Sequence, residues 1–468
     1  MIRFYFALLM GKLSRIAISI LRSFLHTGGS HFPGQLAIKL CPNFLSLVGK
    51  PQEIICVTGT NGKTTLSNLI SDIYEDKGIS VVSNRAGSNM APGVATALLL
   101  DVTLGNRPRS KVAVLEIDEK SSTAIYKHIT PNYLVVTQLV RDSMMRNAHP
   151  YYILDIINKA LPDSTKLILN ADDIISTLIK PKNARVYYSI SKLPGEIVKT
   201  SLVNDARVCP KCNGVLKYDF TRYGHIGRAT CPDCGYASPE GKYTVTKMDT
   251  QEMHFDVRME DGSIINFPLI SDSIFNTYDE LAAIAFFGEY GFTPEETMNS
   301  LAKLKVVDSR YMNDEVAGVE VVSNMTKSLI APACSAVFDY VRSNPKEKEI
   351  AIFIEDPHTI DNNSYMYDTD FEYLNDPLIK KIIIVGKKPQ EFYQRFLFAG
   401  VPRDKMVQVS SVDEIVPNLS LKPGTAVYLL YDNYQVNNNT KARKLVLDEL
   451  KKRAEGQTCT QEGGSENV

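Results

Sequence analysis

The segment VTGTNGKTT, at positions 57–65, has the residue types and spacing of a phosphate-binding loop. A glycine-rich turn between a strand and a helix presents backbone N–H groups and the positive end of the helix to an anion. Lys63 could reach the terminal phosphates, and the hydroxyl of Thr64 could ligate Mg²⁺. Val57 stands where the usual eight-residue form has its first glycine, so an ordinary turn is the alternative. We predict nucleotide binding through Gly59, Thr60, Asn61, Gly62, Lys63, Thr64 and Thr65.

Acidic residues that could complete a Mg²⁺ site follow a second apolar run. Glu116 closes the run VAVLE, and Asp118 and Glu119 come directly after it. Mg²⁺ is usually bound by one or two carboxylates together with phosphate and water. We therefore predict Thr64 and Glu116 as magnesium ligands and Glu116 as a catalytic residue beside Lys63. Asp118 and Glu119 could instead belong to a solvated loop.

Four of the eight cysteines form two C-x2-C pairs, which are Cys209 with Cys212 and Cys231 with Cys234. Each pair predicts a tight knuckle, and four thiolates complete a tetrahedral zinc shell. A closed shell has no open position for a substrate, so we predict a structural zinc that substitutes for a hydrophobic core in a small module. This cysteine usage suits a reducing cytosol better than a secreted disulfide framework.

Short β-rich runs alternate with helical stretches in the N-terminal part of the chain. Apolar strands that alternate with helices predict a parallel sheet covered on both faces, with candidate ligands at the ends of neighbouring strands. The runs are EIICV (53–57), ISVVS (79–83), VAVLEI (112–117), YLVVT (133–137) and KLIL (166–169), with helices such as 66–77 and 151–160 between them.

A second alternating segment begins near residue 316 and predicts a smaller, doubly wound α/β domain. Its strands are VEVVS (319–323), EIAIFI (349–354), KIIIVG (381–386) and AVYLLY (426–431). The fold class is therefore α/β. We expect an N-terminal helical segment (1–50), an ATP-binding domain (51–305) with the cysteine module inserted at 205–240, a C-terminal α/β domain (306–453) and a polar, disordered tail (454–468).

The charge balance and the N-terminal sequence indicate which partners the protein could bind. Because 52 basic residues face 53 acidic ones, no basic excess points to nucleic acid. The N-terminal run MIRFYFALLMGKLSRIAISILRSFL is interrupted by Lys12, Arg15 and Arg22, too often to span a bilayer, and it lacks a cleavage site. We predict a basic amphipathic helix that packs on its own domain. A helix that lies on a membrane surface is the alternative.

These motifs resemble the MurT family, the Mur-ligase-like subunits of bacterial lipid II isoglutaminyl synthase, over nearly the whole chain. The four-cysteine ribbon separates this subfamily from other Mur ligases, and the resemblance implies a Mur-ligase-like fold around an ATP-binding P-loop domain. The matching segments are RFYFALLMGKLSR with GQLAIKLCPNFL, VTGTNGKTT, SNRAGSNMAPGVATALLL, LEIDE, LVVTQLVRDSMMR, LNADD and FNTYDELAAIA.

The resemblance implies an ATP-dependent amidation. ATP would phosphorylate the α-carboxylate of D-Glu in the lipid II stem peptide, and ammonia would attack the acyl phosphate to give D-isoglutamine. In the family pattern Asn276 contacts adenine, and Arg310 stabilises the acyl phosphate. Asn276 could instead cap a helix that begins near 277, and Arg310 could be a surface residue. Asn170 and Asp172 could be turn residues or lie near the nucleotide.

The resemblance also implies a partner. None of the seven histidines lies in a recognisable glutaminase motif, so ammonia would come from a separate GatD-like glutaminase subunit. In the family an aspartate of the C-terminal domain completes the partner's Cys–His pair; the matching region is 354–372, where Asp361 is the first choice and Asp356 the second. A lipid II substrate implies a cytoplasmic protein at the inner face of the membrane.

Two other functions stay open. One is a Mur-type ligase that joins an amine to another carboxylate without a glutaminase partner. The other is a degenerate ligase that binds nucleotide as a scaffold. The intact Lys63, Thr64 and Glu116 argue against a scaffold, whereas Ser309 and Met312, which depart from the family pattern around Arg310, argue for it.

Overall fold

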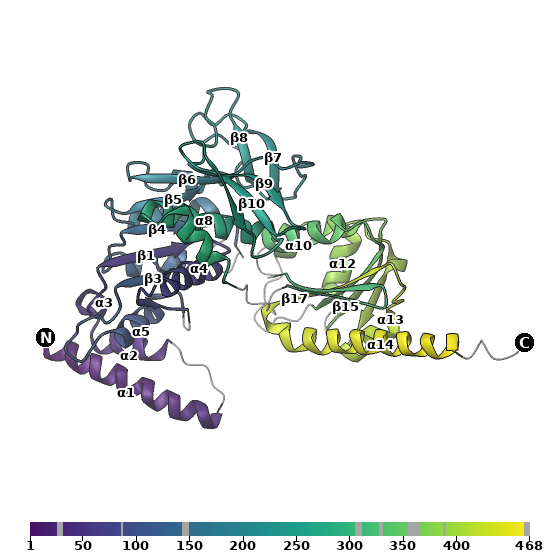
Figure 1. The fold of residues 1–468 in the computed structure, drawn as a ribbon, viewed down its shortest axis with the longest axis horizontal. Helices are drawn as coiled ribbons and strands as arrows, with labels where there is room; N and C mark the ends of the chain where they lie inside the picture. Colours follow the sequence, from purple (N-terminus) through teal and green to yellow (C-terminus); the bar gives the residue numbers. More distant parts are fainter. Residues whose placement is uncertain are drawn as a thin grey trace, which may run out of the picture. The chain divides into compact units, whose positions relative to one another are not determined.

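The computed structural model describes residues 1–25, 31–85, 88–142, 149–304, 311–326, 331–353, 365–386 and 390–462. The chain divides into two units. Unit 1 comprises Met1–Val140, His149–Lys199 and Asp205–Val306, and unit 2 comprises Arg141–Ala148, Thr200–Asn204 and Val307–Val468. Figure 1 labels the elements of both units along the chain.

Unit 1 is built on a nine-stranded sheet with the order β11-β10-β9-β6-β5-β4-β1-β3-β2. The strands from β2 to β9 in this order pair in parallel, which confirms the predicted parallel sheet. The strands are β1 (Glu53–Thr58), β2 (Val81–Ser83), β3 (Val112–Glu116), β4 (Tyr133–Val136), β5 (Lys166–Asn170), β6 (Arg185–Ile190), β9 (Tyr243–Asp249), β10 (His254–Arg258) and β11 (Ile264–Pro268).

The apolar runs in the sequence did not predict β6 or the three strands from β9 to β11. The last two pair antiparallel at the sheet edge, and their residues alternate between buried and exposed. Such half-buried strands lack the continuous apolar runs that mark a buried parallel strand.

Helices cover both faces of this sheet because successive side chains of a strand point to opposite sides. Ile54 and Cys56 of β1 share a core with α5 (Ala91–Asp101), α6 (Ser122–Ile125) and α7 (Pro150–Ala160). On the other face, α4 (Lys63–Asp76) packs against α8 (Ile274–Tyr290) and α9 (Pro294–Leu301). Tyr74 fixes this contact, since its ring lies edge-on to Phe287, with centroids 5.0 Å apart. Two short 3-10 helices are η1 (Glu119–Ser121) and η2 (Ser176–Leu178).

The N-terminal helices belong to unit 1. Helices α1 (Ile2–Leu25) and α2 (Phe32–Leu40) pack on α5, and α3 (Phe44–Leu47) packs on α1 and α2. Phe4 of α1 stacks on Phe44 of α3, with ring centroids 5.4 Å apart. This agrees with a helix packed on its own domain. Among the described helices, none combines the length and hydropathy needed to cross a membrane.

The cysteine module contains a hairpin of β7 (Lys217–Tyr223) and β8 (Ile226–Thr230), placed in the chain between β6 and β9. Leu216 and Ala229 join the same core as α5 and α7, so the module is packed on unit 1. The hairpin lies at the end of unit 1 opposite to α1 (Figure 1).

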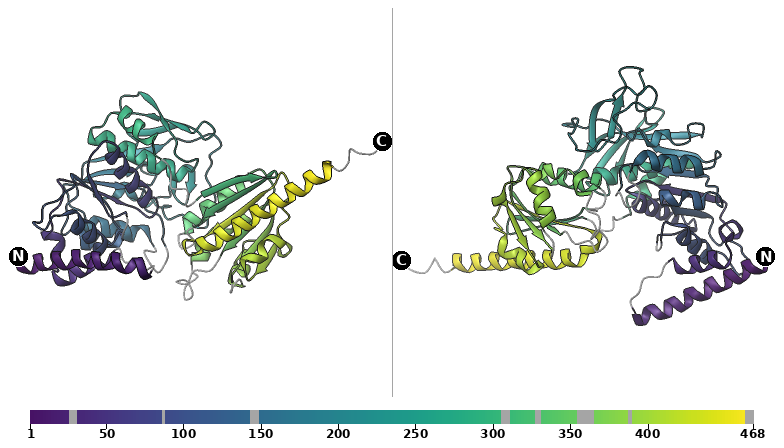
Figure 2. Two further views of the ribbon diagram at one scale, coloured as in Figure 1. Left: turned by 60° about the horizontal axis from the view of Figure 1, so that its bottom comes forward. Right: turned by 180° about the vertical axis from the view of Figure 1, so that it is seen from behind.

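Unit 2 has a six-stranded sheet with the order β12-β13-β17-β14-β15-β16, parallel except at β12. One core lies under α10, α11, α12 and η3, and another lies under α13 and α14; Figure 2 shows α14 along its face of the sheet. This confirms the doubly wound prediction. The elements are β12 (Tyr311–Val316), β13 (Val319–Met325), α10 (Ala331–Ser343), β14 (Lys348–Phe353), α11 (Tyr365–Asp368), η3 (Phe371–Leu374), β15 (Ile379–Val385), α12 (Gln390–Phe398), η4 (Arg403–Lys405), β16 (Met406–Val409), η5 (Val412–Glu414), α13 (Ile415–Asn418), β17 (Ala426–Tyr431), η6 (Asn433–Gln435) and α14 (Val436–Glu462).

Helix α14 continues to Glu462, whereas the sequence reading expected a disordered tail from residue 454. Val446 and Leu450 anchor one side of the helix in the core. On the same helix Glu449 pairs with Arg453 at 2.9 Å, one helical turn on. This pair and the absence of proline are compatible with a helix that continues past the last buried turn.

Candidate active site

The predicted phosphate loop joins β1 to α4, between the neighbouring strands β3 and β4. Gly59 has φ +131° and Gly62 has φ +83°, in the region that favours glycine. A Cβ atom on Gly59 would lie 2.1 Å from Thr137 Oγ1, and one on Gly62 would lie 2.2 Å from Asp279 Oδ1. Both glycines are thus required by the backbone conformation and by close neighbours.

The segment after β4 holds the loop in place. The N–H of Thr60 donates to the carbonyl of Gln138 at 2.8 Å, and the hydroxyl of Thr137 donates to the carbonyl of Asn61. The carboxamide of Asn61 is buried, and neither of its polar atoms has a hydrogen-bond partner among the described residues. Since buried polar groups are nearly always paired, this carboxamide fits a site for a polar ligand.

Lys63 begins α4 and is buried against an acidic residue. Its ammonium group donates to Glu119 Oε1 at 2.8 Å and to the carbonyl of Gly59, while the N–H of Gly59 donates to the same carboxylate oxygen at 3.1 Å. Burial disfavours the charge on Lys63, but the adjacent Glu119 outweighs burial, and the pKa of Lys63 is raised. The lysine is therefore held as a cation at a helix N-terminus, where an anion is favoured.

Thr64 and Glu116, the predicted magnesium ligands, lie together. The Thr64 hydroxyl donates to Glu116 Oε2 at 2.9 Å, and Asn89 donates to the other carboxylate oxygen at 3.1 Å. Asn84 bonds both the N–H and the carbonyl of Glu116, each at 2.8 Å, so it fixes the backbone of this residue. A hydroxyl and a carboxylate beside a phosphate loop form the oxygen donor set that suits Mg²⁺.

Helix α8 contributes a second wall to the loop. Asp279, which is buried, faces Gly62. Asn276 lies three residues earlier, on the same side of the helix. The capping alternative for Asn276 is wrong, because the helix begins at Ile274 and Ser273 takes the N-cap position.

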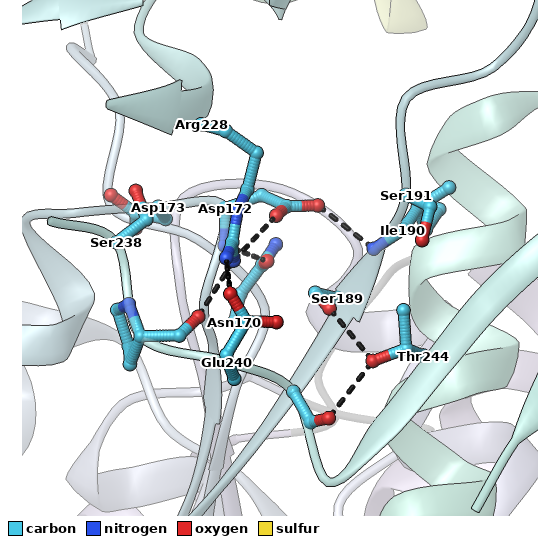
Figure 3. A network of polar contacts seen from close by, with 12 residues as sticks. Asn170, Asp172, Asp173, Ser189, Ile190, Ser191, Arg228, Ser238, Glu240 and Thr244 are labelled. Atoms are coloured by element: carbon cyan, nitrogen blue, oxygen red, sulfur yellow. Dashed lines mark hydrogen bonds and ion pairs between the residues drawn. The ribbon is translucent and has the colours of Figure 1, made fainter. Parts of the chain in front are cut away.

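The segment LNADD supports the loop indirectly. Asn170 donates to the carbonyl of Thr137 at 3.2 Å and accepts the N–H of Asp172 at 3.0 Å, which is a turn geometry. The Asp172 carboxylate, fully buried, accepts the N–H of Ile190 and faces the guanidinium of Arg228 from the cysteine module (Figure 3). Asn170 and Asp172 therefore stabilise a turn and its packing, and their link to the phosphate loop is indirect.

A second arginine of the module reaches the same carboxylate. Arg222 donates to Asp172 at 3.1 Å, to Glu196 at 2.8 Å and to the hydroxyl of Tyr278 at 2.6 Å. Tyr278 also donates to Asp172 at 2.7 Å. Since Tyr278 precedes Asp279 on α8, this network links the cysteine module to the helix that lines the loop.

The four predicted zinc ligands converge, with all four sulfurs within 4.8 Å of one another. The Cys209–Cys234 and Cys212–Cys231 sulfurs are 3.6 and 3.4 Å apart. A disulfide would need about 2.05 Å, whereas a tetrahedral shell with zinc–sulfur bonds of about 2.3 Å places sulfurs about 3.8 Å apart. The cluster could therefore hold a tetrahedral metal ion.

Three predicted residues, Arg310, Asp356 and Asp361, lie outside the described part of the chain. Arg85, in the matching segment SNRAGSNMAPGVATALLL, pairs with Asp72 at 2.7 Å and with Glu75 at 3.2 Å on α4.

Several site residues were not predicted. Glu119 was assigned to a possible solvated loop with Asp118, yet both are buried. Thr137, Asn89 and Asp279 lie within the matching segments LVVTQLVRDSMMR, SNRAGSNMAPGVATALLL and FNTYDELAAIA, but no individual role was predicted for them. The available signal was their place in these segments: Thr137 follows β4, Asn89 precedes α5 and Asp279 lies in the second turn of α8.

Comparison with known proteins adds two family matches and several relatives. The family described as "Mur ligase middle domain" matches residues 57–205, and "MurT ligase C-terminal" matches residues 332–435. The lipid II isoglutaminyl synthase (glutamine-hydrolyzing) subunit MurT of Staphylococcus aureus is 30% identical over 379 residues, which cover 80% of this chain and 84% of that protein. The subunit of the same name from Streptococcus pneumoniae is 27% identical over 429 residues, covering 90% and 93%.

Solved structures show the same fold. A pseudomurein peptide ligase type C from Methanothermus fervidus has a TM-score of 0.65 at 21% identity, covering 86% of this chain and 80% of that one. The MurF ligase from Thermotoga maritima in complex with ADP has a TM-score of 0.60 at 15% identity, covering 90% and 85%. These likenesses confirm the predicted Mur-ligase-like fold.

Proposed function

The chain belongs to the family of MurT subunits of lipid II isoglutaminyl synthase, and from this premise we propose how its residues perform the reaction. The family is one of ATP-dependent carbon–nitrogen ligases that act in peptidoglycan synthesis. The proposed substrate is the α-carboxylate of D-Glu in the lipid II stem peptide. The proposed product is the primary amide, D-isoglutamine.

The reaction has two balanced steps. A carboxylate oxygen attacks the γ-phosphorus of ATP and breaks its bond to the β–γ bridging oxygen, which gives an acyl phosphate and ADP. Ammonia then attacks the acyl carbon and loses a proton, and phosphate leaves. Because charge accumulates on phosphate oxygens in the first step, catalysis depends on fixed positive groups around them.

The observation that carries this proposal is the environment of Lys63. Its buried ammonium and the N–H of Gly59 converge on one carboxylate oxygen of Glu119 at the N-terminus of α4. We assign these two donors to the phosphates of ATP. The unpaired carboxamide of Asn61 and the same-sided Asn276 are assigned to the nucleotide as well, and Arg310 to the acyl phosphate.

Two metals have defined places in this proposal. Thr64 and Glu116 would hold Mg²⁺, which supplies positive charge to the phosphate oxygens. The four cysteines would hold a structural Zn²⁺, a choice supported by the convergence of their sulfurs within 4.8 Å of one another.

The word "subunit" in the names of the relatives implies a complex. We assign the ammonia supply to a GatD-like glutaminase, whose Cys–His pair would be completed by Asp361 or, as second choice, Asp356. Because the proposed substrate is lipid-linked, we propose that the complex acts in the cytoplasm, at the inner face of the membrane.

The test is amide formation by the purified chain with ATP, a soluble lipid II analogue and ammonium chloride, with the product mass as readout. We expect the mass change of a carboxylic acid converted to a primary amide, and its loss in Lys63→Ala. Lys111→Ala is the matched control, since Lys111 is an exposed lysine that begins the neighbouring strand segment. Hydrolysis or binding of ATP without an amide product would contradict this acceptor and favour another carboxylate or a scaffold role.

A further inference from the structure

Helix α1 has two apolar faces, and only one of them is used inside unit 1. Phe4, Ala7, Leu8 and Gly11 recur with helical spacing and are buried. A Cβ atom on Gly11 would lie 2.3 Å from Leu99 Cδ1 of α5. The helix is therefore seated closely on α5, and its orientation is fixed by packing.

The opposite face carries a continuous apolar stripe. Its residues follow one another at alternating steps of four and three, which keeps them on one side of a helix. Their side chains are between 45% and 89% exposed. At about 1.5 Å per residue the stripe extends for about 27 Å. We call these residues the exposed stripe: Ile2, Phe6, Leu9, Leu13, Ile16 and Ile20.

In the sequence, all charged residues before Glu53 are basic. In the structure Asp101, at the end of α5, also acts on Lys12, and its carboxylate accepts hydrogen bonds from Ser110. The first acidic residue of the chain is Glu53, although acidic and basic residues are nearly equal overall. The segment before it contains Arg3, Lys12, Arg15, Arg22, Lys39 and Lys50. This asymmetry favours an anionic partner over another protein surface with mixed charge.

A loop beside α1 also combines an exposed apolar residue with basic residues. Lys12 donates to the carbonyl of Val102 at 2.7 Å, which ties the helix to the loop between α5 and β3. In this loop Leu104 is 63% exposed and is followed by the exposed Arg107 and Arg109. Arg109 lies close enough to act on Lys12, whose pKa is lowered by burial and then by that positive charge.

We propose that α1 is a membrane-surface helix, whose exposed stripe enters the headgroup region of an anionic bilayer while the exposed Arg107 and Arg109 of the adjacent loop contact lipid phosphates. The stripe occupies one side of a helix that carries Lys12 and Arg15 on other sides, so the helix is suited to lie in the interface rather than to span the bilayer. The inference depends on unit 1 alone and not on the reaction proposed above. Membrane binding by α1 would hold the chain at the surface where a lipid-linked acceptor is found.

The test is co-flotation of the full chain with vesicles of phosphatidylcholine alone or mixed with phosphatidylglycerol. We expect binding to the mixed vesicles that weakens as salt is added. The variant Leu9→Gln/Leu13→Gln/Ile16→Gln should bind at least about tenfold more weakly. The control Ile197→Gln/Val215→Gln/Ile264→Gln changes three residues of comparable exposure elsewhere in unit 1 and should bind like the wild type.

A second pair of variants tests the charges. Arg107→Gln/Arg109→Gln should weaken binding about fivefold for each arginine, whereas Arg207→Gln/Arg258→Gln, at two exposed arginines elsewhere, should not. Thermal unfolding of every variant verifies that it folds. No binding by the wild type, or equal binding by the stripe variant, would overturn the proposal.

Sedimentation velocity tests whether a second copy of the chain, instead of a membrane, covers the exposed stripe. A wild-type dimer that the stripe variant converts to a monomer would assign the stripe to a second copy of the chain and overturn the lipid assignment. The flotation assay contains neither ATP nor acceptor, so its failure leaves the proposed reaction untouched. Loss of amidation activity with a soluble acceptor would likewise leave the membrane assignment untouched.

Discussion

The ammonium group of Lys63 lies 2.8 Å from Glu119 Oε1, and the Glu119 side chain is only 3% exposed. The same oxygen accepts the N–H of Gly59 at 3.1 Å. A protein carboxylate is therefore bound by the two donors that we assign to phosphate. Glu119 and nucleotide would compete for Lys63, or share it.

Glu119→Gln should lower the free energy of unfolding and increase the effect of nucleotide. Removing one partner of a buried ion pair leaves Lys63 without its anion, at a cost of about 3 kcal/mol. Phosphate can then supply the missing charge, so the rise in Tm on adding ATP and Mg²⁺ should be larger than in the wild type. Differential scanning calorimetry measures both effects. Glu252→Gln, in an exposed loop, is the control, and a smaller rise in the Glu119 variant would contradict the competition.

Gly62→Ala should abolish nucleotide binding, because it adds a collision to backbone strain. A side chain at φ +83° costs about 1–2 kcal/mol, and the new Cβ would meet the carboxylate of Asp279 at 2.2 Å. Gly78→Ala is the matched control. Gly78 has φ +70° with no atom within 4 Å of an added Cβ, so it has the strain alone.

Isothermal titration with ATP and Mg²⁺ compares these two variants. The double variant Gly62→Ala/Asp279→Ala removes the collision and should have a higher Tm than Gly62→Ala alone. Equal effects of the two single alanines on ATP affinity would show that the contact with Asp279 has no role.

Thr137→Val should weaken ATP binding without a direct contact to ATP. The Thr137 hydroxyl donates to the Asn61 carbonyl within the phosphate loop. Its loss leaves that carbonyl with only the longer bond from the Gln138 amide, at 3.3 Å, and should cost about 1 kcal/mol. Thr165→Val removes a similar buried bond, to the carbonyl of Pro131 at 2.9 Å, away from the loop. Both variants should lose similar stability in urea, but only Thr137→Val should raise the KM for ATP. A raised KM in both would indicate a general loss of structure.

The parts of this fold that the sequence predicted are those with a strong local signal. Buried parallel strands such as 112–117 are apolar along their length, and paired cysteines have few other uses. Strands β10 and β11 were missed because alternating burial at a sheet edge resembles a polar loop. Glu119 was underestimated because its burial depends on Lys63, 56 residues away in the chain, and no local pattern encodes that contact.

Purified chain should contain about one zinc ion, held by the four cysteines. Cys212→Ser should lose most of this zinc and unfold at a lower temperature, since metal binding in such modules supplies folding free energy. Cys334→Ala, at a buried cysteine of unit 2, should keep its zinc. Plasma mass spectrometry gives the metal content of each protein, and a wild type purified from zinc-containing medium without bound metal would refute the assignment.

Arg222→Met should destabilise unit 1 through the carboxylate that it leaves behind. Arg222 and Asp172 are 2% and 0% exposed. Without Arg222, the buried carboxylate keeps only the more distant Arg228, 3.8 Å away, as a cationic partner, so we expect a cost of up to about 3 kcal/mol. Adding Asp172→Asn removes that charge, so the double variant should recover part of the loss. Urea unfolding of the four proteins gives the coupling free energy, which we expect to be about 1–3 kcal/mol.

Arg222→Met should also weaken ATP binding. Tyr278, which accepts a hydrogen bond from Arg222, precedes Asp279 on α8, and Asp279 faces Gly62 of the phosphate loop. Arg395→Met is the control, since Arg395 is equally buried in unit 2 and pairs with Glu372 at 2.9 Å. Both variants should lose stability, but only Arg222→Met should lower ATP affinity, at a temperature where both are folded. If Arg222→Met binds ATP like the wild type, the cysteine module supports the fold of unit 1 without positioning the phosphate loop.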